Sequence, residues 1–325
     1  MIDFVITWVD GKDKKWQKEL LQYSSISGDK RIVRYRNWEF LKYWFRGVEE
    51  NAPWVNKIYF VTEGHLPKWL NLSHPKLKII KHSDIIDNKF LPVFNSRAIE
   101  VNIHKIKGLS DKFVYFNDDF FIIDKLDPSF FFRKNLPCGM AVFNAITGGG
   151  VSDAILEAVT IINKHFQKKE VLKNNFQKWF NLKYKCFLAR TLLLLPWPNF
   201  TGFYEDHMPT PFLKSTFQEV WNLEEEILLK TSSSKFRCLG TVNPYIFKYW
   251  QFVSGKFYPF NSDKYVKMYQ VTDDAIQDIC DDIKKHKMKI IVLNDSDSIL
   301  DFPFLRDNLK TAFDKILPEK SSFEK

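Results

Sequence analysis

Short runs of β-branched and aromatic residues alternate along the chain with longer segments in which apolar residues recur at helical spacing. Continuous apolar runs bounded by polar residues are typical of strands that are buried on both faces of a sheet. These runs predict five strands, over residues 2–9, 57–61, 77–80, 113–116 and 288–293. The helical spacing predicts helices over residues 14–23, 38–50, 92–106, 264–287 and 302–316.

Strands that alternate with helices are typical of an α/β fold, here a three-layer sandwich around a mostly parallel sheet. Residues 1–144 form the first part of this fold. Residues 145–260 show mainly helical spacing with basic and aromatic faces, which predicts a helical insertion. Residues 261–317 return to the α/β core, where the strand over residues 288–293 is expected to rejoin the same sheet. Residues 318–325 are expected to form a flexible tail.

Carboxylate and amide side chains stand at the points where predicted strands end. Two adjacent carboxylates, Asp118 and Asp119, follow the run over residues 113–116. Ionised Asp is rarely buried without a partner, and a divalent cation can hold two such groups together. A simple turn is the alternative, because Asn117 and Asp118 are good turn formers. Similar groups follow the first and last predicted strands: Asp10, Asp13, Asn294, Asp295 and Asp297.

Ligands of open α/β sheets bind at the carboxyl ends of the strands, so we expect the functional site at this edge. For Asp10 and Asp13, a turn and a helix cap are the alternative, since a helix is predicted to follow them. Arg34 and Arg36 precede the predicted helix over residues 38–50, and guanidinium groups near a helix N-terminus suit phosphate oxygens. A pair of arginines on a solvated surface is the alternative there.

Two further features are candidates for function. Asn95 and Ser96 are cap candidates for the helix over residues 92–106, in which Glu100 and His104 stand four positions apart and form either part of a site or a salt bridge. Three consecutive glycines at residues 148–150 precede a helical pattern but lack the spacing of a P-loop or a dinucleotide-binding fingerprint. We interpret them as a flexible gate or a substrate-side turn.

The composition narrows the class of partner and the compartment. The chain of 325 residues has a net charge of +9, with lysines along its whole length, which favours a polyanion or an anionic membrane surface as partner. Because zinc-ligand spacing, a recognition-helix pattern and an aromatic RNA-binding motif are missing, nucleic acid is not expected to bind. Four cysteines without C-x-x-C spacing predict free, buried thiols in a reducing compartment.

The start of the sequence lacks the pattern of a signal peptide, and no apolar run approaches the roughly 18 residues of a membrane-spanning helix. We therefore expect a cytoplasmic protein. The most apolar run covers residues 191–198 and ends at two prolines, Pro196 and Pro198. We interpret it as the end of a core helix, with membrane contact as the alternative.

Four segments carry a resemblance to a known family. DFVITWVDGKD covers residues 3–13, and residues 34–71 and 91–119 contain RYRNWEFLKYWFRG and VYFNDD. GFYEDHMPTPF begins at residue 202 and is followed by TSSSKFR, which ends at Arg237, and IIVLNDSD covers residues 290–297. In this order they resemble the four signature blocks of the Stealth family of sugar-1-phosphate transferases. That family includes bacterial capsule polymerases and the catalytic subunit of the lysosomal-enzyme GlcNAc-1-phosphotransferase. Two positions depart from its pattern: Asn37 stands where Asp is usual, and Val292 where Cys is common.

The resemblance implies a fold similar to that of nucleotide-diphospho-sugar transferases, with the nucleotide-sugar bound by residues 1–144 and the active site completed by residues 145–260. The implied reaction transfers a hexose-1-phosphate from a nucleotide-sugar, with a UDP-GlcNAc-like donor favoured, to a hydroxyl of a polysaccharide or oligosaccharide acceptor. The product is a phosphodiester linkage in capsular or other cell-surface polysaccharide. A peripheral position on the inner face of the cell membrane is expected, and the oligomeric state is left open.

This chemistry needs a cation on the diphosphate, a fixed positive charge on the transferred phosphoryl group and a base near the acceptor hydroxyl. The expected catalytic residues are His207, as base or acceptor orienter, Arg237, as phosphate clamp, Asp118 and Asp10. Mg²⁺ or Mn²⁺ is expected on three carboxylates: Asp118, Asp119 and Asp295. The residues expected to bind the donor are Arg34, Arg36, Asn95, Ser96 and Asn294.

Two other functions fit the sequence less well. A metal-dependent glycosyltransferase that transfers the sugar without phosphate would use the NDD run at residues 117–119 in place of an Asp-x-Asp metal motif. A non-catalytic polysaccharide-binding protein would use Trp and Tyr residues on its surface, but it leaves the clustered Asp, His and Arg positions without a reason.

Overall fold

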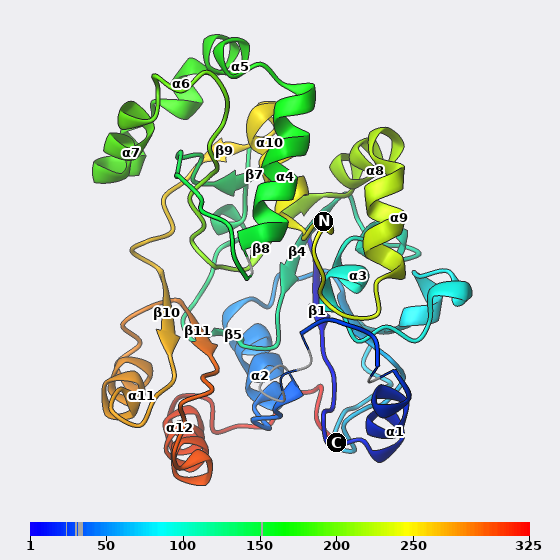
Figure 1. The fold of residues 1–325 in the computed structure, drawn as a ribbon. Coiled ribbons are helices and arrows are strands. Elements are labelled where there is room, and N and C mark those ends of the chain that lie inside the picture. The colour runs from blue at the N-terminus through cyan, green and yellow to red at the C-terminus, as the bar shows by residue number, and fades with distance from the viewer. Residues whose placement is uncertain (24, 30, 32–34, 151) are drawn as a thin grey trace.

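The computed structural model describes residues 1–23, 25–29, 31, 35–150 and 152–325. Its central sheet has five strands in the order β3–β2–β1–β4–β8 (Figure 1). These strands are β1 (Asp3–Thr7), β2 (Ile58–Thr62), β3 (Leu77–Lys81), β4 (Lys112–Phe116) and β8 (Thr210–Leu213). The first four run parallel and β8 runs antiparallel to β4, which confirms the predicted α/β class with a mostly parallel sheet.

Helices cover both faces of this sheet and complete three layers. Successive side chains of β1 point to opposite faces, so that Phe4 and Ile6 lie in one buried core and Val5 lies in the other. The helices α2 (Leu41–Asn51) and α12 (Phe302–Ile316) belong to the first core. The helices α3 (Ser96–Glu100), α8 (Lys214–Leu223) and α10 (Tyr245–Val253) belong to the second. The predicted three-layer arrangement is therefore confirmed.

A second sheet consists of β5 (Phe120–Ile122), β10 (Val266–Gln270) and β11 (Ile290–Asn294), in the order β10–β11–β5. The expectation that the last strand rejoins the central sheet is wrong, because the chain turns directly after β4 and β5 pairs antiparallel with β11. The helix predicted over residues 264–287 is also wrong in its first half. There the chain forms β10, which pairs with β11, and α11 (Ile276–Lys284) begins only afterwards.

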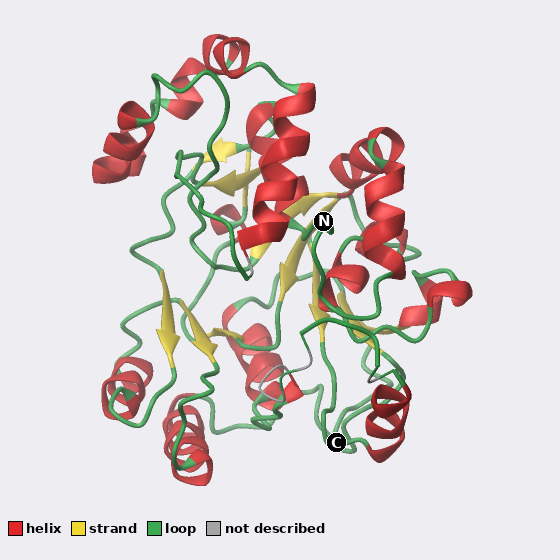
Figure 2. Ribbon diagram, in the orientation of Figure 1, coloured by secondary structure: helices red, strands yellow, loops and turns green. Residues whose placement is uncertain are grey.

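The segment over residues 145–260 is mainly helical, as Figure 2 shows, but it also supplies β8 to the central sheet. Its last strand, β9 (Tyr258–Pro259), pairs with β7 (Leu136–Gly139), which in turn pairs with β6 (Phe132–Arg133). Its other helices are α4 (Ser152–His165), α5 (Lys168–Asn174), α6 (Phe176–Trp179), α7 (Leu188–Leu193) and α9 (Glu225–Ser233). Near the start of the chain lies α1 (Lys14–Gln22).

The last eight residues are not a flexible tail, contrary to the expectation from their polar sequence. Phe323 is buried in the first core, and the carboxylate of Glu324 pairs with Arg46 of α2 at 2.7 Å. The backbone N–H of Lys325 donates to the carbonyl of Trp69. One buried aromatic ring and one buried ion pair thus hold this segment in place. The segment is too short for its hydrophobic pattern to predict that it is ordered.

Two other expectations can be compared with the structure. All four cysteines are free thiols, but only Cys138 and Cys280 are buried, while Cys186 is exposed. Among the described residues, no helix has both the length and the apolar character needed to cross a membrane.

Candidate active site

A cavity of about 450 Å³ opens at the edge of the central sheet where β1 and β4 end. The central sheet, the sheet of β10, β11 and β5, and the mainly helical segment all contribute to its wall. Residues far apart in the sequence therefore meet there. The polar and charged side chains that line it include Asp29, Arg36, Asn37, Ser96, Arg97, Glu100, Tyr115, Asn117, Asp118, Asp119, His207, Arg237, Asn243, Tyr245, Asn294 and Asp295.

The carboxylate pair occupies the turn between β4 and β5. The backbone N–H of Phe120 donates to the carbonyl of Asn117, which reverses the chain. Solvent reaches Asp118 from the cavity, yet the surrounding protein desolvates its carboxyl group and raises its pKa to about 6. Burial, together with the charge of Asp118, raises the pKa of Asp119 to about 8. Ionising both groups is therefore costly unless a positive charge lies beside them.

The pair suits a cation. The Oδ1 atom of Asp119 is buried, and no hydrogen-bond donor among the described residues reaches it. However, the described residues contain no group of three or more His, Cys, Asp or Glu side chains that could hold a metal ion by themselves. Mg²⁺ is commonly held by one or two carboxylates together with substrate phosphates and water, so Asp118 and Asp119 fit such an ion without a third protein carboxylate.

Asp295 was expected to be the third metal ligand, but its oxygens are already engaged. Its Oδ1 accepts from Arg36 at 2.9 Å, and its Oδ2 accepts from the indole Nε1 of Trp38 at 3.2 Å. Burial raises the pKa of Asp295, and the charge of Arg36 opposes this shift. Asp295 thus ties the segment before α2 to the end of β11. Among the described residues, the three aspartates expected to hold the metal therefore do not form one group.

Arg36 and Asn294 line the cavity, although not in the setting that the sequence predicted. Helix α2 begins at Leu41 rather than Trp38, so Arg36 does not lie at its first turn, and its guanidinium lies 5.2 Å from the ring centre of Phe302. Asn294 donates from Nδ2 to Gln270 at 2.6 Å. The other predicted phosphate contact, Arg34, lies outside the described residues.

Arg237 and Ser96 meet at the cavity wall from different parts of the chain. The Nη2 atom of Arg237 donates to the hydroxyl oxygen of Ser96 at 2.7 Å. Asn95 is the N-cap of α3, as its residue type predicted, and its side-chain oxygen accepts from the N–H of Arg97. Its Nδ2 donates both of its N–H groups, to the carbonyls of Ser234 and Phe236, and Asn95 is fully buried away from the cavity. Asn95 therefore holds the backbone directly before Arg237 and does not face the cavity as a donor-binding residue would.

His207 lies beside the carboxylate turn. Its ring packs edge-to-face on Phe120, 5.3 Å between ring centres, and its backbone has φ 40°, which is uncommon for a residue with a Cβ atom. Burial lowers the pKa of His207, as does the charge of Lys248, while Asp206 opposes them. The imidazole is therefore neutral at neutral pH.

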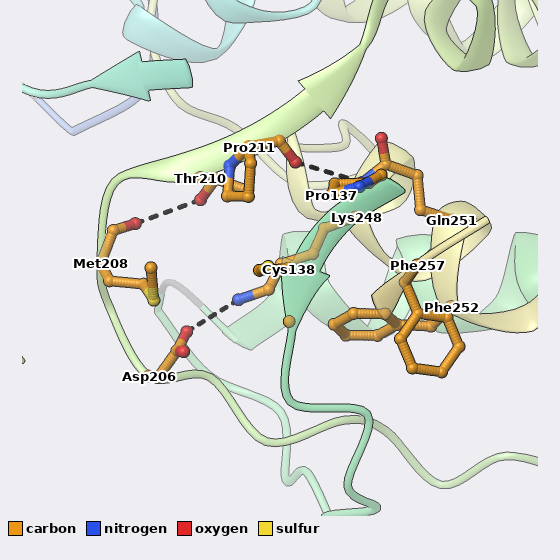
Figure 3. A pocket seen from close by; sticks show the side chains of 11 residues that line it. Pro137, Cys138, Asp206, Met208, Thr210, Pro211, Lys248, Gln251, Phe252 and Phe257 are labelled. Carbon is orange, nitrogen blue, oxygen red and sulfur yellow. Dashed lines mark hydrogen bonds and ion pairs between the residues drawn. The ribbon is translucent and has the colours of Figure 1, made fainter. Parts of the chain in front are cut away.

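A buried ion cluster holds the loop that carries His207. Lys248 of α10 donates to Glu205 at 2.8 Å and to Asp206 at 2.9 Å, and the hydroxyl of Ser262 donates to Asp206 at 2.5 Å. Figure 3 shows the bond between Lys248 and Asp206 beside a small buried pocket lined also by Met208. Burial opposes the charge on Lys248, but the two carboxylates outweigh it and raise its pKa. Spacing in the sequence gave no sign of this cluster, because Lys248 stands 43 and 42 positions after Glu205 and Asp206.

The carboxylates after β1 organise a loop rather than line the cavity. Asp13 caps α1 by accepting from the N–H of Trp16, which was its alternative interpretation. Asp10 accepts from the N–H of Lys12 and from Nδ2 of Asn37 at 3.2 Å. An Asp at position 37 could not donate this hydrogen bond, so Asn37 suits the carboxylate opposite it. The catalytic role expected for Asp10 has no support in this geometry.

Sequence reasoning did not single out Arg97 in the cavity wall. Arg97 is buried on α3 and donates to Thr241, and its place one residue after Ser96 was the available signal. Glu100, which the sequence offered as part of a site, does line the cavity. It accepts from the hydroxyl of Tyr115 at 3.1 Å, and that hydroxyl also contacts Thr7 at 2.9 Å.

Glu100 and His104 do not share a helix face as predicted, because α3 ends at Glu100. His104 packs between Phe217 and Trp221, and burial lowers its pKa to about 3, which is typical of a structural histidine. The glycine run at residues 148–150 does not line the cavity, and the N–H of Gly149 donates to Asp153 in the first turn of α4.

The chain is similar to known families, known proteins and solved structures. The family models described as Stealth protein CR1, conserved region 1, and Stealth protein CR2, conserved region 2, match residues 2–28 and 34–138. A capsular polysaccharide phosphotransferase, WcwK, of Streptococcus pneumoniae is 45% identical over 100% of this chain and 98% of its own length. An exopolysaccharide phosphotransferase, cps2G, of Lactiplantibacillus plantarum is 39% identical over 100% of this chain and 96% of its own length. Among solved structures, the galactosyltransferase LgtC with donor and acceptor sugar analogues aligns over 95% of both chains at 9% identity, with a TM-score of 0.41. The match to the two polysaccharide phosphotransferases extends over the entire sequence, and the chain belongs to the Stealth family.

Proposed function

We propose that this protein is a phosphotransferase that moves a hexose-1-phosphate from a nucleotide-sugar to a sugar hydroxyl, forming phosphodiester linkages in a capsular or other cell-surface polysaccharide. The observation that carries the proposal is the meeting of a carboxylate pair, a guanidinium group and a neutral imidazole in one cavity, in a chain that aligns end to end with polysaccharide phosphotransferases. The carboxylate pair can hold a cation on the nucleoside diphosphate, the guanidinium group can bind the transferred phosphoryl group, and the imidazole can serve the acceptor hydroxyl.

The donor diphosphate would lie between the carboxylate turn and the arginines of the cavity wall. A bound divalent ion would neutralise the diphosphate charge at Asp118 and Asp119 and stabilise the nucleotide as it leaves. Arg237 would donate to the transferred phosphoryl oxygens, and Ser96 keeps its guanidinium in place beforehand. Arg97 is a second cation on the same wall.

His207 would accept the proton of the acceptor hydroxyl. A base must be unprotonated before it can act, and burial together with Lys248 keeps this imidazole neutral at neutral pH. Because His207 and Arg237 both lie in residues 145–260, we also propose that this segment completes the active site, while residues 1–144 bind most of the nucleotide-sugar.

The same proposal includes a UDP-GlcNAc-like donor, a polysaccharide or oligosaccharide acceptor, and dependence on Mg²⁺ or Mn²⁺. A cytoplasmic protein that is held peripherally at the inner face of the membrane is consistent with the net charge of +9. The sugar-transferring alternative uses the same donor, so the released nucleotide separates the two reactions.

The deciding experiment incubates the purified protein with Mg²⁺, an oligosaccharide acceptor and a panel of UDP-, CMP- and GDP-linked sugars, and identifies the released nucleotide by mass. For a uridine donor we expect UMP and an acceptor whose mass has increased by one hexosyl phosphate. Release of UDP with an acceptor that gains only the sugar would establish the glycosyltransferase alternative. Binding of the oligosaccharide without turnover of any donor would point to a binding protein.

Replacement of Arg237 by alanine is expected to lower kcat by roughly a hundredfold to a thousandfold while KM for the donor changes only a few-fold, because the charge on the phosphoryl oxygens redistributes most strongly in the transition state. Lysine should restore little, since a point charge cannot reproduce the planar fork of a guanidinium. Steady-state kinetics with Arg306→Ala on α12 as the control measure the effect. If both Arg237 variants keep full turnover and only melt earlier, Arg237 merely anchors α3 through Ser96.

The activity of the wild-type protein should fall at acidic pH with a midpoint below 6.5, the ordinary pKa of histidine, because the environment of His207 favours the neutral ring. As the pH falls through that pKa, the ring binds a proton and can no longer act as a base. We expect His207→Gln to lose this acidic limb together with a hundredfold or more of the rate. The profile is measured at saturating Mg²⁺ and donor. An unchanged limb in His207→Gln would assign the base to a carboxylate, with Glu100 a candidate on the wall.

A further inference from the structure

The chain between Lys168 and Trp197 forms an arm at the outer edge of the molecule, made of α5, α6, a 3₁₀ turn (Leu182–Phe187) and α7 (Figure 1). No residue of this arm, all of which the structure describes, lines the cavity. The proposed reaction therefore does not explain the function of the arm.

The arm exposes large apolar side chains. Leu182 is 86% exposed, Leu193 is 74% exposed, and Leu192 and Trp197 are each more than half exposed. Phe176 on α6 adds a fifth exposed side chain. The interpretation of residues 191–198 as the end of a core helix is thus wrong for Leu192 and Leu193, while Leu194 and Leu195 are partly buried against the second core. Single exposed leucines are common on protein surfaces, but a group of five within one short arm needs a partner.

The same arm carries most of the net charge of the chain. Residues 168–197 contain seven Lys or Arg residues and a single acidic residue, Glu170, so they account for +6 of the total of +9. Lysines do occur along the whole chain, but elsewhere acidic residues nearly balance them. Within the described residues, the ion pairs to carboxylates do not involve any of these seven side chains. Lys178, Lys183 and Arg190 contact only neutral groups.

Two lysines are crowded together at one end of the arm. Lys264 lies close enough to Lys185 to lower its pKa, although Asp263 is also nearby. Two ammonium groups at this separation repel each other, so an anion beside them would be stabilising. The backbone of Lys185 has φ 52° and ψ −130°, a region that residues with a Cβ atom rarely adopt and that the surrounding structure must enforce.

The surface is held in shape by contacts beneath it. The buried ammonium group of Lys168 donates to three carbonyls directly after α7, those of Leu194, Leu195 and Trp197. Trp179 and Tyr184 are fully buried below α6 and the 3₁₀ turn. The leucines are therefore presented by an ordered scaffold.

We propose that this arm is a docking surface for an anionic lipid bilayer. Leucine and tryptophan side chains suit the boundary between headgroups and acyl chains, and lysines around them suit the phosphates of anionic lipids. A soluble polyanion would use the lysines but would leave the leucines in water. A second copy of the chain would cover the leucines, but the two arms, each with a net charge of +6, would repel each other. The bilayer satisfies both features, whatever reaction the cavity carries out.

The test is cosedimentation of the full-length protein with vesicles rich in phosphatidylglycerol and with vesicles of phosphatidylcholine alone. We expect binding to the anionic vesicles that weakens steeply with salt, and little binding to the neutral ones. Lys183→Gln/Lys185→Gln should lower the partition coefficient by roughly twentyfold or more, at about fivefold for each lysine. Leu192→Ser/Leu193→Ser should lower it at least about tenfold.

Matched controls remove the same groups elsewhere. Lys14→Gln/Lys15→Gln on α1 and Leu300→Ser before α12 change exposed residues outside the arm and should bind as the wild type does. Melting temperatures verify that all variants are folded, and turnover of a soluble acceptor without vesicles should be the same for arm and control variants. Equal loss in arm and control pairs, or unchanged binding in both arm pairs, overturns the proposal. The proposal is also overturned if the wild type does not bind vesicles and instead forms a dimer in solution that Leu192→Ser/Leu193→Ser dissociates.

Discussion

Replacing Asp118 by asparagine is expected to reduce turnover by about a thousandfold or more while leaving the fold at least as stable as before. The variant keeps the shape of the side chain but removes the charge that would bind the cation on the donor diphosphate. A raised pKa means that the folded state disfavours the ionised carboxyl group, so the wild-type protein is destabilised at neutral pH by the charge it needs. The melting temperature of Asp118→Asn, measured without divalent ions, should therefore stay the same or rise.

Thermal shift with Mg²⁺ gives a readout of the same site that does not require turnover. Together with a nucleotide, Mg²⁺ should raise the melting temperature of the wild type and of Asp274→Asn, a control with an exposed aspartate before α11, by mass action on the folded state. The shift should be lost in Asp118→Asn. Full activity of the wild type in excess chelator, or a normal Mg²⁺ shift in Asp118→Asn, would contradict the assignment of the carboxylate turn.

Replacing Lys248 by methionine is expected to cost about 3–5 kcal/mol of folding stability, the largest loss that we expect from a single substitution outside the apolar core. Methionine fills a similar volume, but the carboxylates of Glu205 and Asp206 then lie buried without their cation. Burial already raises the pKa of Glu205, and only the lysine and its neighbours keep the pKa of Asp206 below its ordinary value. Chemical denaturation measures the loss.

The pH dependence of this loss separates charge from packing. In the wild type the lowered pKa of Asp206 contributes stability above its unfolded pKa, and this contribution is lost as the pH falls through the folded pKa. In Lys248→Met both carboxyl groups favour the protonated form, so the variant recovers as the pH falls. We therefore expect a smaller stability difference at pH 5 than at pH 8.

Lys168 offers a matched control, because it is equally buried but donates only to neutral carbonyls. Lys168→Met should lower stability by about 1–3 kcal/mol and to the same extent at both pH values. A loss in Lys248→Met that is the same at pH 5 and pH 8 would mean that packing, rather than charge, dominates the cluster. Adding Asp206→Asn to Lys248→Met should recover part of the stability if the charge interpretation is right.

Much of the fold could be predicted because local patterns determine it. Continuous β-branched and aromatic runs predicted β1 to β4 and β11 to within two residues, and α12 was predicted with its observed bounds. Pairing was harder to predict. The buried residues of β10, Val266 and Tyr269, stand three positions apart, a spacing that also fits a helix, and pairing with β11 makes the segment a strand.

Residue types predicted some of the site, but partners decide what each residue can do. Asp118, Asp119, His207 and Arg237 do line one cavity. Asp295 does not join the carboxylate pair, because Arg36, 259 positions away, already occupies one of its oxygens. No local pattern contains that information. For the same reason the cluster around Lys248, whose partners come from before β8, was not predicted.

The cavity wall begins at Thr7 and ends at Asp295, and the N–H of Leu293 on β11 donates to the carbonyl of Asp119 in the carboxylate turn. Closing a loop of this length is among the later and slower events of folding, since its entropic cost comes before most of its contacts form. A chain that has formed only the central sheet therefore has buried strands but no active site. In a refolding experiment, fluorescence from the aromatic cores should recover ahead of catalytic activity, and turnover should return only with the phase that docks the second sheet.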